Sequence, residues 1–228
     1  TPLGVAPGIE KPLLIAPRPG NGRNSEGDFI QLKDGRILLV YSKFIGTGDH
    51  ASAELAGRYS SDGGQTWSRE DVQIIGLKAG EANLMSVSLL RLRDDRIALF
   101  YVQKYDSPAG SKYPYLDYIL MRTSADEGKT WSDPTYVVPK DKPGYRVLNN
   151  DRVVQLKSGR LVVPLAVHYL PGWSKWESSA QMMCYLSDDE GKTWRHSEST
   201  LNSELLAQEP GVVQLKDDGL LMFCRSRD

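Results

Sequence analysis

The sequence predicts an all-β protein, a β-propeller built from four-stranded antiparallel blades. Two observations lead to this prediction. Sequence elements recur about every sixty residues, which indicates stacked structural units. Runs rich in β-branched and aromatic residues, separated by turn residues, take the place of any 3.6-residue apolar period, so helices should be scarce. The 228 residues, 40% of them hydrophobic, are enough for a sizeable core.

The first recurring element has Ser, Asp, Gly, Thr and Trp at fixed spacing. Its three copies are SSDGGQTW at 60–67, SADEGKTW at 124–131 and SDDEGKTW at 187–194. The Asp can accept hydrogen bonds from the turn backbone, the Gly can adopt positive φ, and the Trp supplies a ring to bury. A calcium loop would need alternating carboxylates and a terminal Glu, which are missing. The element is therefore expected to be structural.

The second recurring element precedes each copy of the first and reads as a strand after a tight turn. Its four copies are LKDGRILLV at 32–40, LRDDRIALF at 92–100, LKSGRLVVP at 156–164 and LKDDGLLMF at 215–223. Together the elements predict a single propeller domain over 1–228, with blades at about 24–80, 81–145, 146–206 and, in part, 207–228. About three and a half blades leave open sheet edges, so we expect either further C-terminal blades or closure in a homo-oligomer.

Composition excludes several classes of function. The net charge of −1 gives no general attraction to nucleic acid or to an anionic membrane, and no apolar run is long enough to span a bilayer. Cys184 and Cys224 lie in apolar runs and are expected to be buried free thiols. Neither has a His or Cys at ligand spacing, so no metal and no cofactor is expected.

Propeller geometry predicts which loops carry function. The turn between the first two strands of a blade and the Ser-Asp-Gly-Thr-Trp element lie on one face, and the entry to the first strand and the loop between strands two and three lie on the other. Six residues before the Leu of each second element stand Glu26, Ser86, Asn150 and Glu209. A ring of polar side chains at one depth beside the axis indicates a ligand site, although strand entries are often polar in any case.

The Ser-Asp-Gly-Thr-Trp element resembles the Asp box, or bacterial neuraminidase repeat, of the sialidase superfamily. The resemblance covers essentially the whole chain, and complete members are six-bladed propellers. It implies an exo-acting glycosidase that releases a terminal acidic sugar, sialic acid above all, from a glycan. In that family an arginine triad binds the substrate carboxylate, an Asp is the acid/base, and a Tyr activated by a Glu is the nucleophile. A secreted or periplasmic location is also implied.

The family pattern maps onto this chain in part. EPGVVQLKDDGLLMFCR places Glu209 and Arg225 where the family has its Glu and its second triad Arg, and Asp49 best matches the acid/base. The first triad Arg normally lies in a Phe-Arg-Ile-Pro motif, where this chain has NSEGD and a Glu26. The third Arg and the Tyr would lie beyond Asp228.

The resemblance and the loop chemistry together define a set of candidate residues. We expect catalytic roles for Glu209, Asp49 and His50, and substrate binding by Arg225, Arg18, Arg23, Glu26, Asn150, Arg152, His168 and Trp173. Arginines can pair with a carboxylate bidentately, and a Trp can stack on a sugar ring. The two loop histidines can act as base and acid or can simply hydrogen-bond to their neighbours.

Two alternatives remain open at this stage. A related propeller could act on another acidic sugar such as a uronide, by hydrolysis or by elimination, with His50 or His168 as the base. A non-catalytic propeller could instead bind a glycan on the same face. The density of carboxylates, histidines and arginines favours the enzyme.

Overall fold

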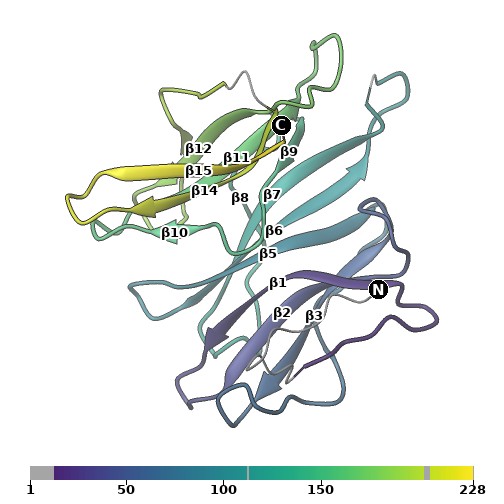
Figure 1. Ribbon diagram of the computed structural model, residues 1–228, viewed down its shortest axis with the longest axis vertical. Coiled ribbons are helices and arrows are strands. Elements are labelled where there is room, and N and C mark those ends of the chain that lie inside the picture. The colour runs from purple at the N-terminus through teal and green to yellow at the C-terminus, as the bar shows by residue number, and fades with distance from the viewer. Residues whose placement is uncertain (1–12, 112, 203–205, 228) are drawn as a thin grey trace.

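The computed structural model describes residues 13–111, 113–202 and 206–227, and in these ranges the chain forms four antiparallel sheets and no helix (Figure 1). Blade one consists of β1 (Arg23–Gln31), β2 (Ile37–Phe44), β3 (Ala53–Ser60) and β4 (Val72–Ile75). Blade two consists of β5 (Asn83–Arg91), β6 (Ile97–Asp106), β7 (Tyr115–Ser124) and β8 (Thr135–Tyr136). The β-propeller class predicted from the repeats is confirmed.

Blade three has a divided inner strand. It contains β9 (Tyr145–Val147), β10 (Val154–Gln155), β11 (Leu161–Tyr169), β12 (Gln181–Ser187) and β13 (Arg195–His196). Both β9 and β10 pair with β11, near its two ends, so together they take the place of one first strand. Blade four is represented by β14 (Leu206–Gln214) and β15 (Leu220–Arg227).

The Asp boxes form hydrogen-bonded turns, and the second and third boxes also pack a Trp against the apolar clusters between blades. In the second box Ser124 Oγ accepts from Gly128 N and donates to Asp126, whose carboxylate accepts from both the backbone and the hydroxyl of Thr130. This hydrogen bonding lowers the pKa of Asp126 to about 2. Trp131, at the end of the same box, packs against the hydrophobic core that blades one and two share. Each box is thus structural, as its sequence predicted.

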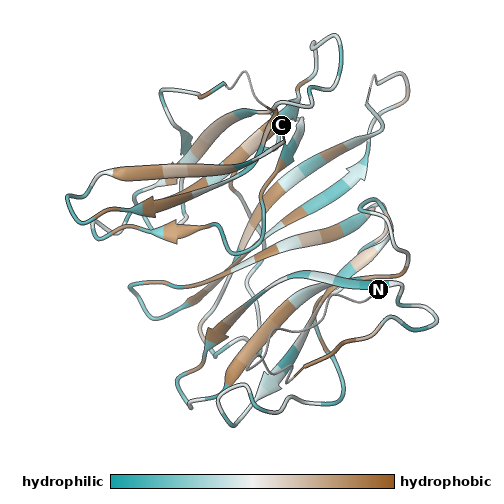
Figure 2. Cartoon of the chain, viewed as in Figure 1, coloured by the Kyte–Doolittle hydropathy of each residue, from teal (hydrophilic) through white to brown (hydrophobic). Residues whose placement is uncertain are grey.

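Two large hydrophobic clusters fill the spaces between neighbouring blades. One lies mainly between blades one and two and includes Leu38, Leu55 and Leu99. The other lies mainly between blades two and three and includes Phe100, Met121 and Val163. In Figure 2 the hydrophobic residues lie mostly in the strands, and the hydrophilic ones mostly in the turns and loops. Blade-on-blade packing therefore fixes the angle at which the inner strands meet.

Blade four presents apolar side chains to solvent. Most of the exposed large hydrophobic residues of the described chain belong to it: Leu206, Val213, Leu215, Leu220, Leu221 and Phe223. Cys224, expected to be buried, is exposed on β15, because blade four has only two strands among the described residues. Cys184 is half-buried, and both thiols are free.

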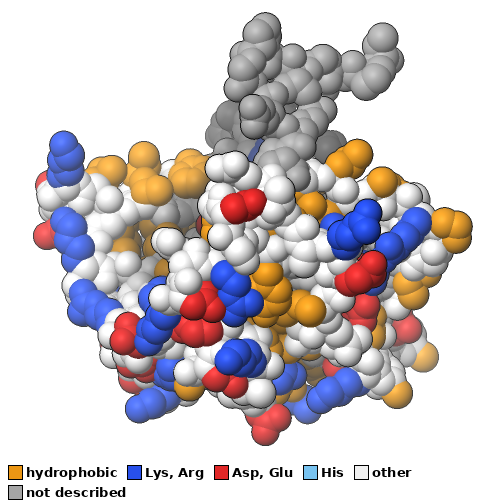
Figure 3. All heavy atoms as spheres, turned by 90° about the horizontal axis from the view of Figure 1, so that it is seen from below, with side chains coloured by type: hydrophobic (Ala, Val, Ile, Leu, Met, Phe, Trp, Pro, Cys, Tyr) orange, Lys and Arg blue, Asp and Glu red, His pale blue; other side chains and the backbone are white. Residues whose placement is uncertain are grey.

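The face of the molecule shown in Figure 3 mixes acidic and basic side chains, and neither sign of charge dominates it.

Candidate active site

The inner strands of all four blades carry a non-glycine residue in the left-handed region at the same level. These residues are Glu26 (φ 55°), Ser86 (φ 62°), Asp151 (φ 53°) and Glu209 (φ 53°). In blades one, two and four the pairing register shifts at this residue, and in blade three it lies in the gap between β9 and β10. Left-handed backbone is costly for residues with a side chain, and such strain gathers at functional sites.

The expected ring of polar residues needs one correction. Asp151, and not Asn150, occupies the ring position in blade three. Asp151 lies five positions before the Leu of the following turn, whereas the ring residues of the other blades lie six positions before theirs, so counting back six from that Leu overshoots by one. Asn150 still lies near the axis, where its side-chain amide donates to Gly27 O at 3.4 Å.

Glu26 and its neighbours connect blade one to blade two at the axis. Ser86 Oγ donates to Glu26 Oε2 at 3.0 Å. Two residues further on, the buried carboxylate of Asp28 accepts from Leu89 N at 2.7 Å and from Phe29 N at 2.7 Å. Burial is the main cause that raises the pKa of Asp28 to about 6. These contacts fix where the Glu26 carboxylate lies.

Arg23 connects the inner strand of blade one to the loop between β2 and β3. Its Nη1 lies 2.6 Å from Asp49 Oδ1, and its Nη2 lies 3.5 Å from Glu26 Oε1. Two buried residues of blade two hold the same loop from the other side, since Asn83 Nδ2 donates to Asp49 O at 2.8 Å and Lys104 Nζ donates to it at 3.3 Å. The expected residues Arg23, Glu26 and Asp49 therefore meet in one cluster.

The pKa values of the two carboxyl groups in this cluster, Glu26 and Asp49, are shifted in opposite directions. Burial raises the pKa of Glu26, against the opposing effects of Ser86 and Arg23. The hydrogen bond from Arg23 lowers the pKa of Asp49. Burial lowers the pKa of His50, with the nearby Lys104 acting in the same direction, so the imidazole favours its neutral form. The raised pKa of Glu26 favours its protonated form, whereas the lowered pKa values of Asp49 and His50 favour an ionised carboxylate and a neutral imidazole.

Aromatic rings line the mouth of the propeller beside this cluster. His50 stacks on Tyr115, with centroids 4.0 Å apart and an interplanar angle of 10°. Tyr145 lies between the two histidines, 6.3 Å from each ring centroid. His168 is buried, stacks on Trp176 at 4.6 Å and contacts Glu177 O through Nδ1 at 2.7 Å. Burial lowers the pKa of His168. A continuous row of rings thus runs from blade one to blade three.

A second charged pair ends this row on blade four. Arg225 Nη2 lies 3.1 Å from Glu209 Oε1 and also donates to Gln208 Oε1. Arg225 is close enough to His168 to contribute to the lowering of its pKa. Glu209 and Arg225, which the resemblance gave separate roles, thus lie side by side, with the Arg225 side chain 46% exposed.

Three expected binding residues make other contacts. Arg18 lies 3.5 Å from Asp71, which also pairs with Lys43 and Arg58, so it does not join Arg23. Arg152 has its guanidinium 5.3 Å from the Phe223 ring centroid and packs blade three on blade four. Trp173 packs against the aromatic cluster, but it is Trp176 that stacks on His168. Placing these side chains requires tertiary contacts that spacing does not reveal.

The expected set also missed residues that build the site. Tyr145 has no motif around it, and its central place depends on how β9 packs between the loops of blades one and three. Lys104 lies near the end of β6, and only the structure shows that it is buried and donates to Asp49 O. Asp117 is fully buried against Arg146, and burial raises its pKa to about 6. Charged residues in apolar strands were the available signal.

The described residues contain no group of three or more His, Cys, Asp or Glu side chains arranged to hold a metal ion. None of the described segments is a helix long and apolar enough to cross a membrane.

The four-stranded blades and the Asp boxes define a β-propeller of the BNR type. Residues 77–228 match the model of the BNR repeat-like domain, and residues 58–69 match that of the BNR/Asp-box repeat. The chain belongs to the BNR repeat-like family. No curated protein matches it significantly.

Solved structures with the same fold include several sialidases. A protein of unknown function from Dyadobacter fermentans has 19% identity and a TM-score of 0.74, with 94% of this chain and 65% of that chain covered. Trypanosoma rangeli sialidase in complex with 2,3-difluorosialic acid has 16% identity and a TM-score of 0.66, covering 89% and 34%. The leech intramolecular trans-sialidase has 17% identity and a TM-score of 0.68, covering 95% and 49%. The chain therefore spans less than two thirds of each of these proteins.

Proposed function

We propose that the protein is an exo-acting glycoside hydrolase that releases a terminal acidic sugar, sialic acid in the first instance, from a glycan. The observation that carries the proposal is the cluster of Arg23, Glu26 and Asp49. In this cluster the pKa of Glu26 is raised and that of Asp49 is lowered. Opposite shifts in two neighbouring carboxyl groups assign an acid and an ionised partner. The sialidase structures that share the fold support the same class of reaction.

Each member of the cluster has a role in this reaction. Glu26, whose burial favours the protonated form, donates a proton to the glycosidic oxygen as the bond to the sugar breaks. Asp49, held ionised by Arg23, stabilises the positive charge that develops on the sugar ring. A water molecule then adds to the anomeric carbon and gives its proton to the Glu26 carboxylate, which restores the acid. This assignment replaces the acid role expected for Asp49 from the sequence, because a lowered pKa suits a carboxylate and not an acid.

The sugar carboxylate requires a cation that still has donors to offer, even if it is already paired with one carboxylate. Arg23 is held by two carboxylates, whereas Arg225 has nearly half of its side chain exposed and lies at the other end of the ring row. We therefore assign the substrate carboxylate to Arg225, with Glu209 orienting the guanidinium. A guanidinium can bind a carboxylate with two parallel hydrogen bonds. The rings between the two charged pairs supply stacking surface for the sugar and its aglycone.

The test is release of a fluorescent aglycone from an α-linked sialoside, a hexuronide and a neutral hexoside. Wild type is expected to turn over an acidic substrate, and Glu26→Gln and Asp49→Asn are each expected to lower kcat by at least about a hundredfold. Asp95→Asn is the matched control, because Asp95 is an exposed turn residue between β5 and β6 whose positive φ suits Asn. Loss of turnover in the control, or full turnover in both site variants, would refute the assignment.

A second reaction is favoured by one observation. His50 lies beside Asp49, and its lowered pKa leaves the imidazole neutral and able to accept a proton. A uronide substrate could then lose the proton next to its carboxylate and eliminate the leaving group, which gives an unsaturated sugar. Product analysis separates the two reactions, because only elimination adds a carbon–carbon double bond and consumes no water.

A binding function without turnover would depend on the ring row alone. In that case Trp173→Ala or Trp176→Ala should weaken glycan binding, while Glu26→Gln leaves it unchanged. Binding measured by calorimetry with no product after prolonged incubation would favour this function over the hydrolase.

A further inference from the structure

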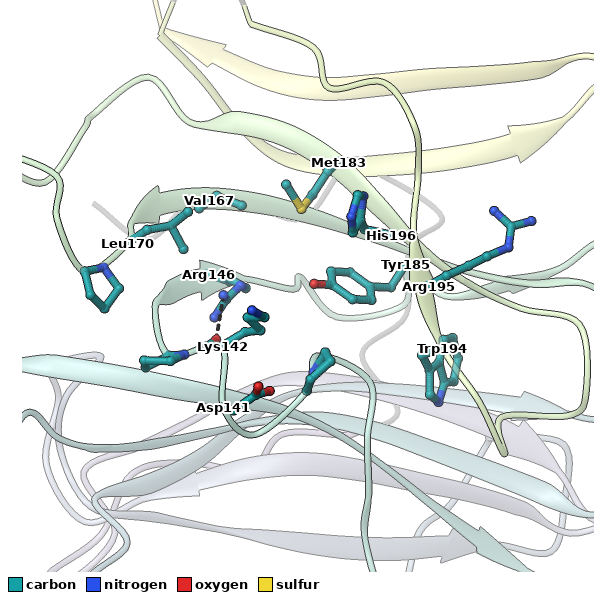
Figure 4. Close-up of a pocket in the computed structure, with 13 residues that line it drawn as sticks. Asp141, Lys142, Arg146, Val167, Leu170, Met183, Tyr185, Trp194, Arg195 and His196 are labelled. Atoms are coloured by element: carbon teal, nitrogen blue, oxygen red, sulfur yellow. Dashed lines mark hydrogen bonds between the residues drawn. The ribbon is translucent and has the colours of Figure 1, made fainter.

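A cavity lies between blades two and three. Arg146 of β9 lines it, whereas the neighbouring Tyr145 points to the other face of the strand, toward the row of rings. Its volume is about 490 Å³, within the usual range for small-molecule sites. One wall is the connection from β8 to β9, from Pro139 to Arg146. The other wall comes from β11, β12 and β13 and includes Val167, Met183, Tyr185 and Trp194 (Figure 4).

Three hydrogen-bond donors of this cavity, on Lys142, Arg146 and Tyr185, lie near one another. Arg146 forms part of the floor and is buried, with Nη2 donating to Lys142 O at 2.9 Å and Nη1 3.4 Å from Asp117 Oδ1. The hydroxyl of the buried Tyr185 points into the cavity toward Arg146 and Lys142 (Figure 4). Burial raises the pKa of Tyr185, so its hydroxyl stays protonated. The positive charge of Arg146 opposes this rise, which indicates that the guanidinium lies close to the hydroxyl. No hydrogen bond within the described chain occupies it.

The rim adds one uncommitted cation. Arg195 pairs with Asp188 at 3.5 Å, and in Figure 4 its guanidinium turns away from the cavity. Lys142 is exposed, and its ammonium has no ion pair among the described residues. Asp141, on the same rim, is the opposing charge. The remaining walls are apolar side chains and prolines, together with the imidazole of His196, which lies beside Met183 (Figure 4).

We propose that this cavity binds a small organic anion with a flat apolar body, such as an aryl carboxylate. The anionic group would accept hydrogen bonds from Lys142 Nζ, Tyr185 Oη and the Arg146 guanidinium, and the ring would lie against Met183 and Trp194. Three donors, two of them without a partner among the described residues and opposed by the single rim carboxylate of Asp141, together with an apolar wall, are the complement of such a ligand. The site is separate from the proposed glycosidase site, since neither Glu26, Asp49 nor Arg225 lines it.

The probe for this site is 4-fluorobenzoate, titrated into the whole protein and followed by fluorine NMR, with neutral 4-fluorobenzamide as its uncharged counterpart. We expect saturable binding of the benzoate and at least tenfold weaker binding of the amide. Lys142→Met and Tyr185→Phe should each weaken benzoate binding severalfold, while Asp141→Asn should strengthen it because it removes the opposing charge. Arg146 is left intact because it is paired with the buried Asp117.

Lys140→Met is the matched control, since Lys140 belongs to the same connection but faces Tyr136 and does not line the cavity. It should bind benzoate as wild type does. Equal effects of Lys140→Met and Lys142→Met, equal affinity for the amide, or the absence of saturation would overturn the proposal. Full benzoate binding by a Lys142→Met/Tyr185→Phe double variant would also overturn it, because the anion would then bind elsewhere.

Discussion

Ser86 Oγ donates a hydrogen bond to Glu26 Oε2 at 3.0 Å, and this contact joins the inner strands of blades one and two beside the axis. The bond stabilises the ionised form of Glu26 and so opposes the effect of burial on its pKa. The acid that we assign to catalysis is therefore held between two opposing influences. Its strength should respond to a change on the neighbouring blade.

Ser86→Gly is the variant that isolates this influence. It removes the hydroxyl and tolerates the positive φ at this position. We expect the pKa of Glu26 to rise further, so the basic limb of the pH profile of kcat/KM should move to higher pH. Carbon NMR of the labelled Glu26 carboxyl would follow the same shift directly. A basic limb that stays in place or moves to lower pH would contradict the role of Ser86.

Asp28 should make stability fall as pH rises. Its pKa is about 6 in the folded protein and 3.8 as a free reference, so the folded state retains the proton over this interval. The stabilising contribution is complete below about pH 4 and is lost as pH rises through about 6, with a magnitude on the order of 3 kcal/mol. Urea unfolding at several pH values gives the free energy of unfolding of wild type and of Asp28→Asn. The difference between the two should change with pH by this amount. A difference that does not change with pH would mean that Asp28 titrates normally.

The Asp boxes allow a comparison of adjacent serines. Ser60 is buried, accepts from Gly64 N at 2.8 Å and donates to Asp62 Oδ1 at 2.9 Å, while Ser61 beside it is exposed. Ser60→Ala should lower the free energy of unfolding by about 1–3 kcal/mol, because the Gly64 N–H loses its acceptor. Ser61→Ala should change it by less than about 0.5 kcal/mol. Equal effects of the two substitutions on thermal unfolding would argue against a structural role for the box.

Gly27 is a position where added bulk should disturb the site. A Cβ atom here would lie 2.7 Å from Val40 O and 2.9 Å from Tyr41 Cβ, both on the paired strand β2. Gly27→Ala should therefore destabilise the protein by about 1–3 kcal/mol and lower activity by displacing Glu26. Gly35→Ala, at an open turn with nothing within 4 Å, is the comparison for added bulk, although its positive φ carries its own cost. Retained activity and stability in Gly27→Ala would show that β1 can move away from β2.

The fold could be predicted from the sequence because its signals are local and repeated. The Asp boxes and the Leu-Lys-Asp-Gly turns mark the same points in each blade, so a misread strand in one copy is corrected by the others. Where candidate residues belong to such a pattern, as Glu209 and Arg225 do, the structure brings them together, while their roles stay predictions. The site was not predictable at Asp151, where one residue is missing between ring and turn, or at Tyr145, whose position depends on packing between blades.

The left-handed residue in each inner strand has a consequence for how this propeller can change. The bend occurs at Glu, Ser, Asp and Glu alike, so it is imposed by the surrounding sheet and does not depend on one side chain. Single substitutions at these four positions can therefore exchange acid, hydroxyl or amide groups at the mouth while the blades keep their packing. A lineage built on this backbone could acquire a new substrate through a few point mutations, and a designer could sample the same four positions as a small library.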